Sequence, residues 1–252
     1  MHGAETPGFW LSGGCGLNGP VSTVESGRRR GGGADETQHS VGVGPWQGQW
    51  PEGEQAHRYD PDLLAHGDSR NVADQYRYWR HEAIVADLDA RRHGLHIAVE
   101  NWGHDFNIGS VIRTANAMNV AEFHIVGRRR WNRRGAMVTD RYQHERHHAD
   151  VATLVAWAAT AGEGGGPLPI IGIDNVPGSV PLETYELPRQ CLMVFGQEGP
   201  GLTAEAIAAC EVVLEIAQFG STRSMNAGAA AAIAMHAWVR RHVFDQVAAS
   251  RP

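Results

Sequence analysis

The stretch LHIAVENWGHDFNIGSVIRTANAMNVAEFHIV, residues 95–126, carries the alternation that decides the fold. It opens with the apolar run 95–99, continues with the amphipathic segment 108–119 and closes with the apolar run 123–126. Short apolar runs indicate buried strands, and apolar residues at three- and four-residue spacing indicate a helix with one buried face. The stretch therefore predicts a strand, a helix and a second strand.

The same alternation continues toward the C-terminus. Strands are expected at 168–174, 191–195 and 212–216, and helices at 151–161, 203–210 and 225–244. Continuous apolar strands separated by helices are typical of a parallel sheet covered on both faces. The predicted fold class is α/β, with a mostly parallel sheet flanked by helices.

The chain has a different composition before this domain. Residues 1–53 hold 14 of the 31 Gly and 4 of the 12 Pro without apolar periodicity, so they bury too little surface to offset their ordering entropy. We expect a disordered Gly/Pro-rich tail over 1–57, a helical N-terminal extension over 58–94 and the main domain over 95–252. In the extension, Asp74 is the expected N-cap and Gly94 the expected stop of one helix.

Composition excludes several classes of protein. The uncharged stretch 224–239 near the C-terminus has 16 residues and contains polar side chains, so it is too short and too polar for a membrane span. The N-terminus lacks the basic and apolar regions of a signal peptide. Three Cys (Cys15, Cys191 and Cys210) without CxxC spacing predict neither a disulfide framework nor a zinc site. A reduced, cytoplasmic protein is the simplest interpretation.

Nucleotide-binding signatures are missing from the loops. No GxGxxG motif follows a predicted strand, and a P-loop would need a Lys, whereas all 22 basic residues are Arg. The GEGGG run at 162–166 follows a helix and precedes a strand, which favours a flexible connection. Ligands of parallel sheets bind beyond the carboxyl ends of the strands, so the loops there are the places to search.

The first such loop leads into NIGSVIRTA, residues 107–115. Asn107 stands where a helix N-cap belongs. Arg113 falls almost opposite the apolar stripe of the helix, where it is free to meet an anionic group. An ordinary capped helix with a surface Arg is the alternative.

Two more loops follow strands. In FGQEGPGLT (195–203), three Gly allow close approach of a ligand, and Glu198 stands at the strand's carboxyl end; a Gly-rich turn before a helix capped by Thr203 is the alternative. In IAQFGSTRSMNAGA (216–229), Ser224 is the expected N-cap of the last helix and Asn226 lies in its first turn. Small residues at 227–232 predict close packing against another element.

Together and in this order, the three motifs resemble those of the SpoU (TrmH-like) RNA ribose 2′-O-methyltransferases of the SPOUT superfamily, over about residues 95–245. The resemblance implies a C-terminal deep trefoil knot, bound S-adenosylmethionine, a homodimer and no metal. The positions that match cofactor contacts are Gly196, Gly201, Ile216, Ser224 and Met225. The positions that match the family's catalytic set are Asn107, Arg113, Glu198, Ser224 and Asn226.

The implied reaction is methyl transfer from S-adenosylmethionine to a ribose 2′-hydroxyl of tRNA or rRNA. The family's mechanism gives the proton of that hydroxyl to the residue that matches Arg113. Because arginine stays charged in proteins, Arg113 could instead pair with the phosphate and stabilise the developing alkoxide. The two roles remain open.

RNA binding needs a positive surface despite the net charge of −6. Residues 128–146 hold seven Arg against two acids, a local charge of +5, and include Trp131 and Tyr142, which could stack on bases. A solvated charged loop is the alternative. The expected RNA contacts are Arg128, Arg129, Arg130, Arg133 and Arg134.

Some residues depart from the family pattern. Ala217 and Gln218 stand where the family usually has Pro-Met. These two residues favour an alternative function, a non-catalytic knotted RNA-binding module. A small-molecule enzyme with a nucleotide cofactor is disfavoured by the missing glycine motifs. His144, His147 and His148 lack the partners of a zinc site and are expected on the surface.

Overall fold

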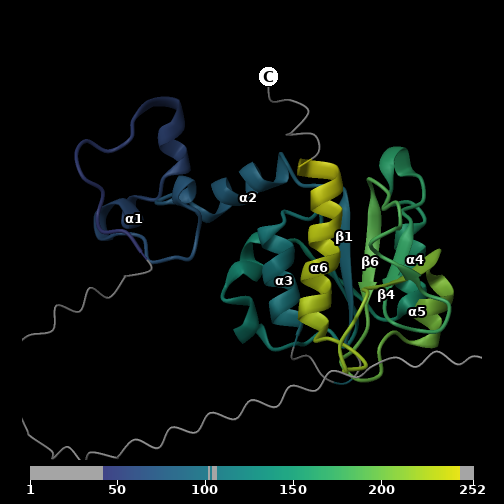
Figure 1. Ribbon diagram of the computed structural model, residues 1–252. Helices are drawn as coiled ribbons and strands as arrows, with labels where there is room; N and C mark the ends of the chain where they lie inside the picture. The colour runs from purple at the N-terminus through teal and green to yellow at the C-terminus, as the bar shows by residue number, and fades with distance from the viewer. Residues whose placement is uncertain (1–41, 102, 104–106, 245–252) are drawn as a thin grey trace, which may run out of the picture. The chain divides into compact units, whose positions relative to one another are not determined.

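The computed structural model describes residues 42–101, 103 and 107–244. At its centre is a parallel seven-stranded sheet of order β3-β2-β1-β6-β4-β7-β5 (Figure 1). The strands are β1 Leu95–Asn101, β2 Phe123–Gly127, β3 Glu145–His148, β4 Ile170–Ile173, β5 Val180–Pro181, β6 Cys191–Phe195 and β7 Val212–Glu215. The predicted α/β class is confirmed. Strands β3 and β5 were not predicted, because β3 is polar and β5 has only two residues.

Two pairs of helices cover the sheet (Figure 1). The helices α3 (Ile108–Ala117) and α6 (Ala227–Val239) pack on one face with Leu95, Ile97 and Val99. The helices α4 (Val151–Ala158) and α5 (Ala204–Ala209) pack on the other face. The alternating side chains of β1 therefore enter two separate apolar cores.

Glycine lets α3 approach its neighbours closely. A Cβ on Gly228 of α6 would lie 3.1 Å from the Ser110 Oγ, and a Cβ on Gly109 would lie 2.7 Å from the Gly135 Cα in the Arg-rich segment. The predicted packing of the small residues in 227–232 is thus directed at α3. Glycine is needed at Gly109 of the first motif for a different reason. The backbone that follows β2 packs directly against this position and leaves no room for a Cβ.

The extension before β1 is less regular than predicted. It contains the 3₁₀ turn η1 (Gly53–Arg58), helix α1 (Pro61–His66), the 3₁₀ turn η2 (Asp74–Tyr76) and helix α2 (His81–Asp89). The single helix expected from Asp74 to Gly94 is wrong. Tyr78 adopts a left-handed backbone (φ 64°), which interrupts the helical hydrogen bonding. Helix α2 starts after Arg80 and ends at Asp89, so neither expected terminus is used.

Residues 42–57 were predicted to belong to the tail, but they pack against this extension. Val43 pairs with Asp68 as an isolated bridge, and the Trp46 backbone N–H donates to the Leu64 carbonyl at 2.9 Å. The buried Asp68 carboxylate accepts from the Arg70 guanidinium and from the Tyr78 amide. Burial raises the pKa of this carboxyl, but these hydrogen bonds outweigh it and bring the pKa to about 2. The remainder of the predicted tail, residues 1–41, lies outside the described residues.

Other expectations concern cysteines, membrane spans and connections. Cys191 and Cys210 are free thiols, and burial raises the pKa of each to about 12. Among the described residues, no helix has the length and apolar character needed to cross a membrane. The run 162–166 connects α4 to β4, as predicted, with left-handed backbones at Gly164 and Gly165.

Candidate functional site

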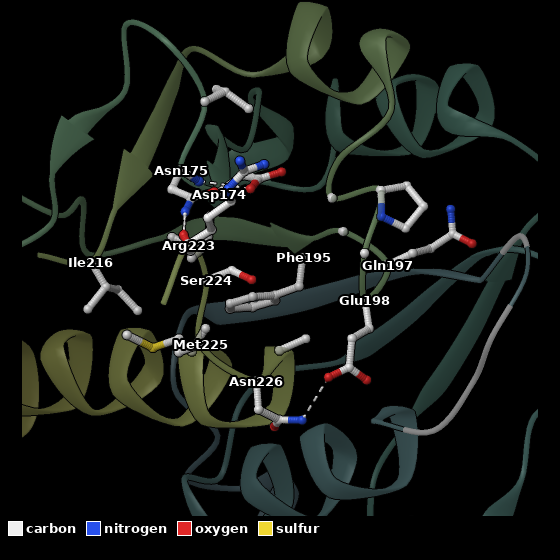
Figure 2. A pocket seen from close by; sticks show the side chains of 18 of the residues that line it. Asp174, Asn175, Phe195, Gln197, Glu198, Ile216, Arg223, Ser224, Met225 and Asn226 are labelled. Carbon is white, nitrogen blue, oxygen red and sulfur yellow. Dashed lines mark hydrogen bonds between the residues drawn. The ribbon is translucent and has the colours of Figure 1, made fainter. Parts of the chain in front are cut away.

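A cavity of about 700 Å³ opens beyond the carboxyl ends of β4, β6 and β7 (Figure 2). The loop after each of these strands contributes to its wall. All five residues expected to contact the cofactor line it, namely Gly196, Gly201, Ile216, Ser224 and Met225. The second and third motifs, about 20 residues apart in sequence, therefore meet around one cavity.

The second motif forms a tight loop. Gln197 and Gly201 exchange backbone hydrogen bonds of 3.1 and 3.0 Å, which fold 197–201 back on itself. A Cβ on Gly196 would lie 2.1 Å from the carbonyl carbon of Gly201, and Gly201 has a left-handed backbone (φ 74°). Both positions need glycine for steric reasons within the protein.

Two polar residues after β4 also line the cavity, and they were not predicted. The Asp174 Oδ2 accepts from the Leu202 amide at 2.7 Å and so holds the second motif. The Asn175 side chain donates to the Arg223 carbonyl and so holds the third. Their position directly after an apolar strand was the available signal, and the family motifs did not include it.

Three expected catalytic residues form a closed hydrogen-bonded triangle. The Asn107 Nδ2 donates to the Glu198 Oε2 at 2.7 Å, and the Asn226 Nδ2 donates to the Asn107 Oδ1 at 2.9 Å and to the Glu198 Oε1 at 3.1 Å. Figure 2 shows the Glu198–Asn226 contact at the rim of the cavity. One residue from each motif enters the triangle, so it joins α3, the β6 loop and the start of α6.

The helix caps explain how these side chains are oriented. The Asn226 Oδ1 accepts from the Ala229 amide at 3.1 Å, so Asn226 and not Ser224 is the N-cap of α6. Ser224 lies two residues before the cap, exposed in the cavity wall. Asn107 occupies the cap position of α3 without a capping bond, because its side chain is engaged in the triangle. The predicted cap at Thr203 is confirmed.

Arg113 lies outside the cavity lining. It is exposed on α3, about 9 Å along the helix from Asn107 at 1.5 Å per residue. Within the described part of the chain, its guanidinium has no hydrogen bond or ion pair. The sequence prediction that Arg113 points away from the buried stripe is confirmed.

The Arg-rich segment divides into exposed and internally paired side chains. The Arg133 guanidinium contacts the Asp140 and Glu145 carboxylates at 2.5 and 3.2 Å and lies over the Trp131 ring. Trp131 and Tyr142 are buried, so the expectation that they stack on bases is wrong for this conformation. Five arginines of the segment are exposed without a carboxylate partner among the described residues, namely Arg128, Arg129, Arg130, Arg134 and Arg141.

A buried side chain positions this segment. The Asn101 Nδ2, at the end of β1, donates to the carbonyls of Arg128 and Arg130 at 2.7 and 3.1 Å. The segment therefore starts at the same edge of the sheet as the cavity. Asn101 was not predicted, because a single Asn at the end of an apolar run is a weak signal.

The expected surface position of the three histidines is only partly correct. His144 is exposed and contacts Asp89, and His147 is half-buried. His148 is buried, and its Nε2 lies 3.1 Å from the Nδ1 of His124, which was not considered. Parallel pairing of β2 and β3 brings these two histidines together.

Comparison with known proteins agrees with this arrangement. Residues 94–236 match the model of the SpoU rRNA methylase family. The Escherichia coli K12 tRNA (guanosine(18)-2′-O)-methyltransferase is 26% identical over 160 residues, 62% of this chain and 68% of its own length. A Saccharomyces cerevisiae protein of that name is 32% identical over 75 residues, 29% of this chain but only 5% of its own length.

Solved structures have the same fold. The SpoU methyltransferase AviRb from Streptomyces viridochromogenes, in complex with the cofactor AdoMet, superposes with a TM-score of 0.55 at 21% identity, over 62% of this chain and 61% of its own. The A. aeolicus TrmH/SpoU tRNA modifying enzyme gives a TM-score of 0.57 at 18% identity, over 69% and 87%. With the family model matching more than half of its residues, this chain belongs to the SpoU rRNA methylase family.

Proposed function

We propose that this protein transfers the methyl group of S-adenosylmethionine to a ribose 2′-hydroxyl of tRNA. The observation that carries the proposal is the cavity walled by the second and third motifs, with the Asn107–Glu198–Asn226 triangle at its rim. The names of the curated relatives favour tRNA and make guanosine 18 the first nucleotide to examine. Ribosomal RNA is the second substrate class to test, since the family description names it.

The cavity suits S-adenosylmethionine in size and chemistry. Its volume lies within the range of small-molecule sites, about 300–1,000 Å³. Phe195, Ile216 and Met225 supply apolar surface for an adenine ring. Ser224 and the backbone polar groups of 196–201 supply hydrogen bonds for the ribose and the amino acid part. We therefore assign cofactor contacts to the five predicted residues in its wall.

The chemistry asks little of the protein beyond orientation and charge. When bound, the sulfonium supplies an activated methyl group for in-line displacement by the ribose oxygen. We assign Arg113 to the phosphate beside the target ribose and to the oxygen anion that develops as the hydroxyl proton passes to solvent water. Because the guanidinium has no partner in the part of the chain that the structure describes, it is available for both. Ser224 and the triangle would hold the ribose and cofactor in line.

We assign RNA binding to the exposed arginines of the Arg-rich segment. Arg128, Arg129, Arg130 and Arg134 are exposed and have no carboxylate partner among the described residues, and Asn101 anchors their loop beside the cavity. The Arg128 guanidinium donates only to the Gly103 carbonyl at 3.4 Å there, a contact that phosphate could replace. Arg133 was also predicted, and its two carboxylate contacts would have to exchange for phosphate before it could bind RNA. It therefore ranks below the other four.

Further features follow from the family assignment. We propose that residues 95–244 form the catalytic domain and that 42–94 form its extension. We also propose that the C-terminal segment passes through a loop and so forms the trefoil knot. The contacts of Asn175 and Glu198 with Arg223 and Asn226 support this, since they tie the last loop to two earlier ones. We also propose a cytoplasmic homodimer, for which sedimentation of the purified protein gives the oligomeric state.

Methyl transfer tests the proposal directly. Purified protein incubated with tritiated S-adenosylmethionine is expected to label unmodified tRNA transcripts, and the label should map to a 2′-O-methylated ribose. Calorimetric titration with the cofactor separates this activity from the non-catalytic RNA-binding module, which would bind RNA but give no heat with cofactor. Cofactor binding without labelling of tRNA or rRNA would contradict the proposed reaction.

Removal of the triangle's carboxylate is expected to slow the reaction more than it destabilises the protein. In Glu198→Ala, Asn107 and Asn226 lose a shared acceptor, and we expect kcat to fall by about 10²-fold because misplacement by about 1 Å costs that much. Asn226 still caps α6, so the free energy of unfolding should fall by less than about 1 kcal/mol.

Glu205→Ala is the matched control, since this exposed glutamate lies on α5 outside the cavity lining. Steady-state kinetics and thermal melting of both variants provide the measurement. Equal activity in the two variants would remove the triangle from the mechanism.

A further inference from the structure

A second cluster of chemically competent side chains lies away from the cavity. His96 and His124 are the second residues of β1 and β2, and Glu122 directly precedes β2. In the register of these parallel strands Ala98 is opposite His124, so the two histidines project from the same face. The cluster stands toward the amino ends of the strands, whereas the cavity lies beyond their carboxyl ends. None of its members has a role in the proposed methyl transfer.

The polar atoms of the cluster converge. The His96 Nδ1 lies 3.2 Å from the His124 Nε2, and the Glu122 Oε2 lies 3.8 Å from the same nitrogen. One ligand atom from each of the three residues falls within 4.8 Å of the others. We propose that His96, Glu122 and His124 bind a divalent transition metal ion, of which Zn²⁺ fits best.

The distances agree with the dimensions of a zinc site. Zinc binds imidazole nitrogen at about 2.0–2.1 Å, so two nitrogens 3.2 Å apart subtend about 100° at a shared ion, close to a tetrahedral angle. The Glu122 Oε2 lies 3.8 Å from the His124 Nε2 and within 4.8 Å of the His96 nitrogen, so the carboxylate must move toward the ion to complete the site. Two imidazoles and one carboxylate leave the fourth position for water. The same donor set with open positions also accepts other first-row ions.

The surroundings hold two of the ligands in orientation. The His124 Nδ1, the nitrogen that faces away from the site, lies 3.1 Å from the His148 Nε2. The Glu122 Oε1 accepts from the Arg146 Nε at 3.0 Å, which leaves Oε2 for the ion. Outer partners of this kind fix the ring and carboxylate of metal ligands. Arg146 also places a positive charge beside the site. We therefore expect a lower affinity for the metal ion than at a site whose neighbouring groups are all neutral or negative.

An aromatic side chain covers the cluster. The Trp157 ring of α4 lies 4.2 Å from the His124 ring and 5.2 Å from the His96 ring, measured between centroids. The alternative is that the cluster binds no ion. In that case His96, His124 and His148 form a hydrogen-bonded chain beneath Trp157.

Metal titration separates the two arrangements. Untagged protein, freed of metal by a chelator and dialysed, is titrated with ZnCl₂ by calorimetry and with CoCl₂ by visible absorption. We expect one ion per chain and the intense visible bands of tetrahedral Co²⁺. His96→Gln and Glu122→Gln each remove one ligand and should weaken binding at least about 10-fold.

The matched control is His66→Gln, which removes an exposed histidine in α1 and should bind like the wild type. Circular dichroism checks that each variant is folded, and the wild-type Co²⁺ spectrum decides the matter if both ligand variants unfold. No binding by the wild type, or equal affinity in all four proteins, would overturn the metal site. Either result would be independent of methyl transfer, whose residues lie elsewhere.

Discussion

Arg113→Ala is expected to lose methyl transfer while it keeps the affinity for S-adenosylmethionine. The side chain is exposed, makes no internal hydrogen bond within the described residues and lies outside the cavity lining, so its removal leaves the cofactor's surroundings intact. In the proposed mechanism Arg113 stabilises charge that develops in the transition state. Loss of one such donor costs about 10²–10³-fold in kcat. Single-turnover rates with tritiated cofactor and calorimetric affinities measure the two quantities.

Two further variants sharpen this experiment. Arg189→Ala removes another exposed arginine, just before β6 and therefore at the amino end of the sheet, and should match the wild type. Arg113→Lys keeps a positive charge but loses the planar fork of guanidinium N–H groups. If Lys restores most of the rate, charge alone is sufficient, whereas a rate as low as that of Ala indicates bidentate contact. Parallel loss of cofactor affinity in Arg113→Ala would make Arg113 a structural residue instead.

Gly196→Ala is expected to disrupt the cofactor cavity itself. The added Cβ would stand 2.1 Å from the Gly201 carbonyl carbon and 2.2 Å from the Leu202 nitrogen, both backbone atoms with little freedom to yield. The folded 197–201 segment must then open, and Asp174 would lose its contact with Leu202. We expect a loss of about 1–3 kcal/mol in the free energy of unfolding, the usual cost of overpacking. Cofactor affinity should fall at least about 100-fold.

Gly178→Ala is the control for backbone strain. Gly178 has a left-handed backbone (φ 89°) but open space around its missing Cβ, and it lies outside the cavity lining. Its substitution should cost about 1–2 kcal/mol in stability and leave cofactor affinity unchanged. Calorimetry and thermal melting compare the two variants. Normal cofactor affinity in a folded Gly196→Ala protein would show that this cavity does not bind the cofactor.

Most of the sheet was predictable, and the reasons are local. Strands β1, β2, β4, β6 and β7 are apolar because both faces are covered, and a run of that kind is visible in any sequence. Strand β3 reads ERHH and lies at the edge of the sheet, where one side of the strand is unpaired, so its side chains did not need to be apolar. The sequence did not reveal that the expected helix is interrupted at Tyr78. The aromatic residues there recur at helical spacing, but they make packing contacts on either side of a turn and do not belong to one helix.

The roles of individual polar residues were harder to predict than their presence. The motifs predicted that Ser224 caps the last helix, yet Asn226 does so and also enters the triangle. Either residue type caps a helix well, so sequence alone could not choose between them. Trp131 was expected to face RNA because it stands among arginines, but the strands around it supply a carboxylate partner and an apolar core. Burial of a side chain depends on what packs over it.

By itself, the sequence determined the α/β class, the membership suggested by three ordered motifs, and five of the residues that line the cavity. The class follows from periodicity along short segments, whereas the five residues follow from the resemblance of the motifs to the family. Only the tertiary structure decided that Asn107, Glu198 and Asn226 form one triangle, that Asp174 supports the second motif, and that three histidines from neighbouring strands lie in line. The histidines meet because the register of β1, β2 and β3 sets which side chains are neighbours. The triangle and the Asp174 contact depend instead on how helix starts and loops distant in sequence pack beyond the carboxyl ends of the strands.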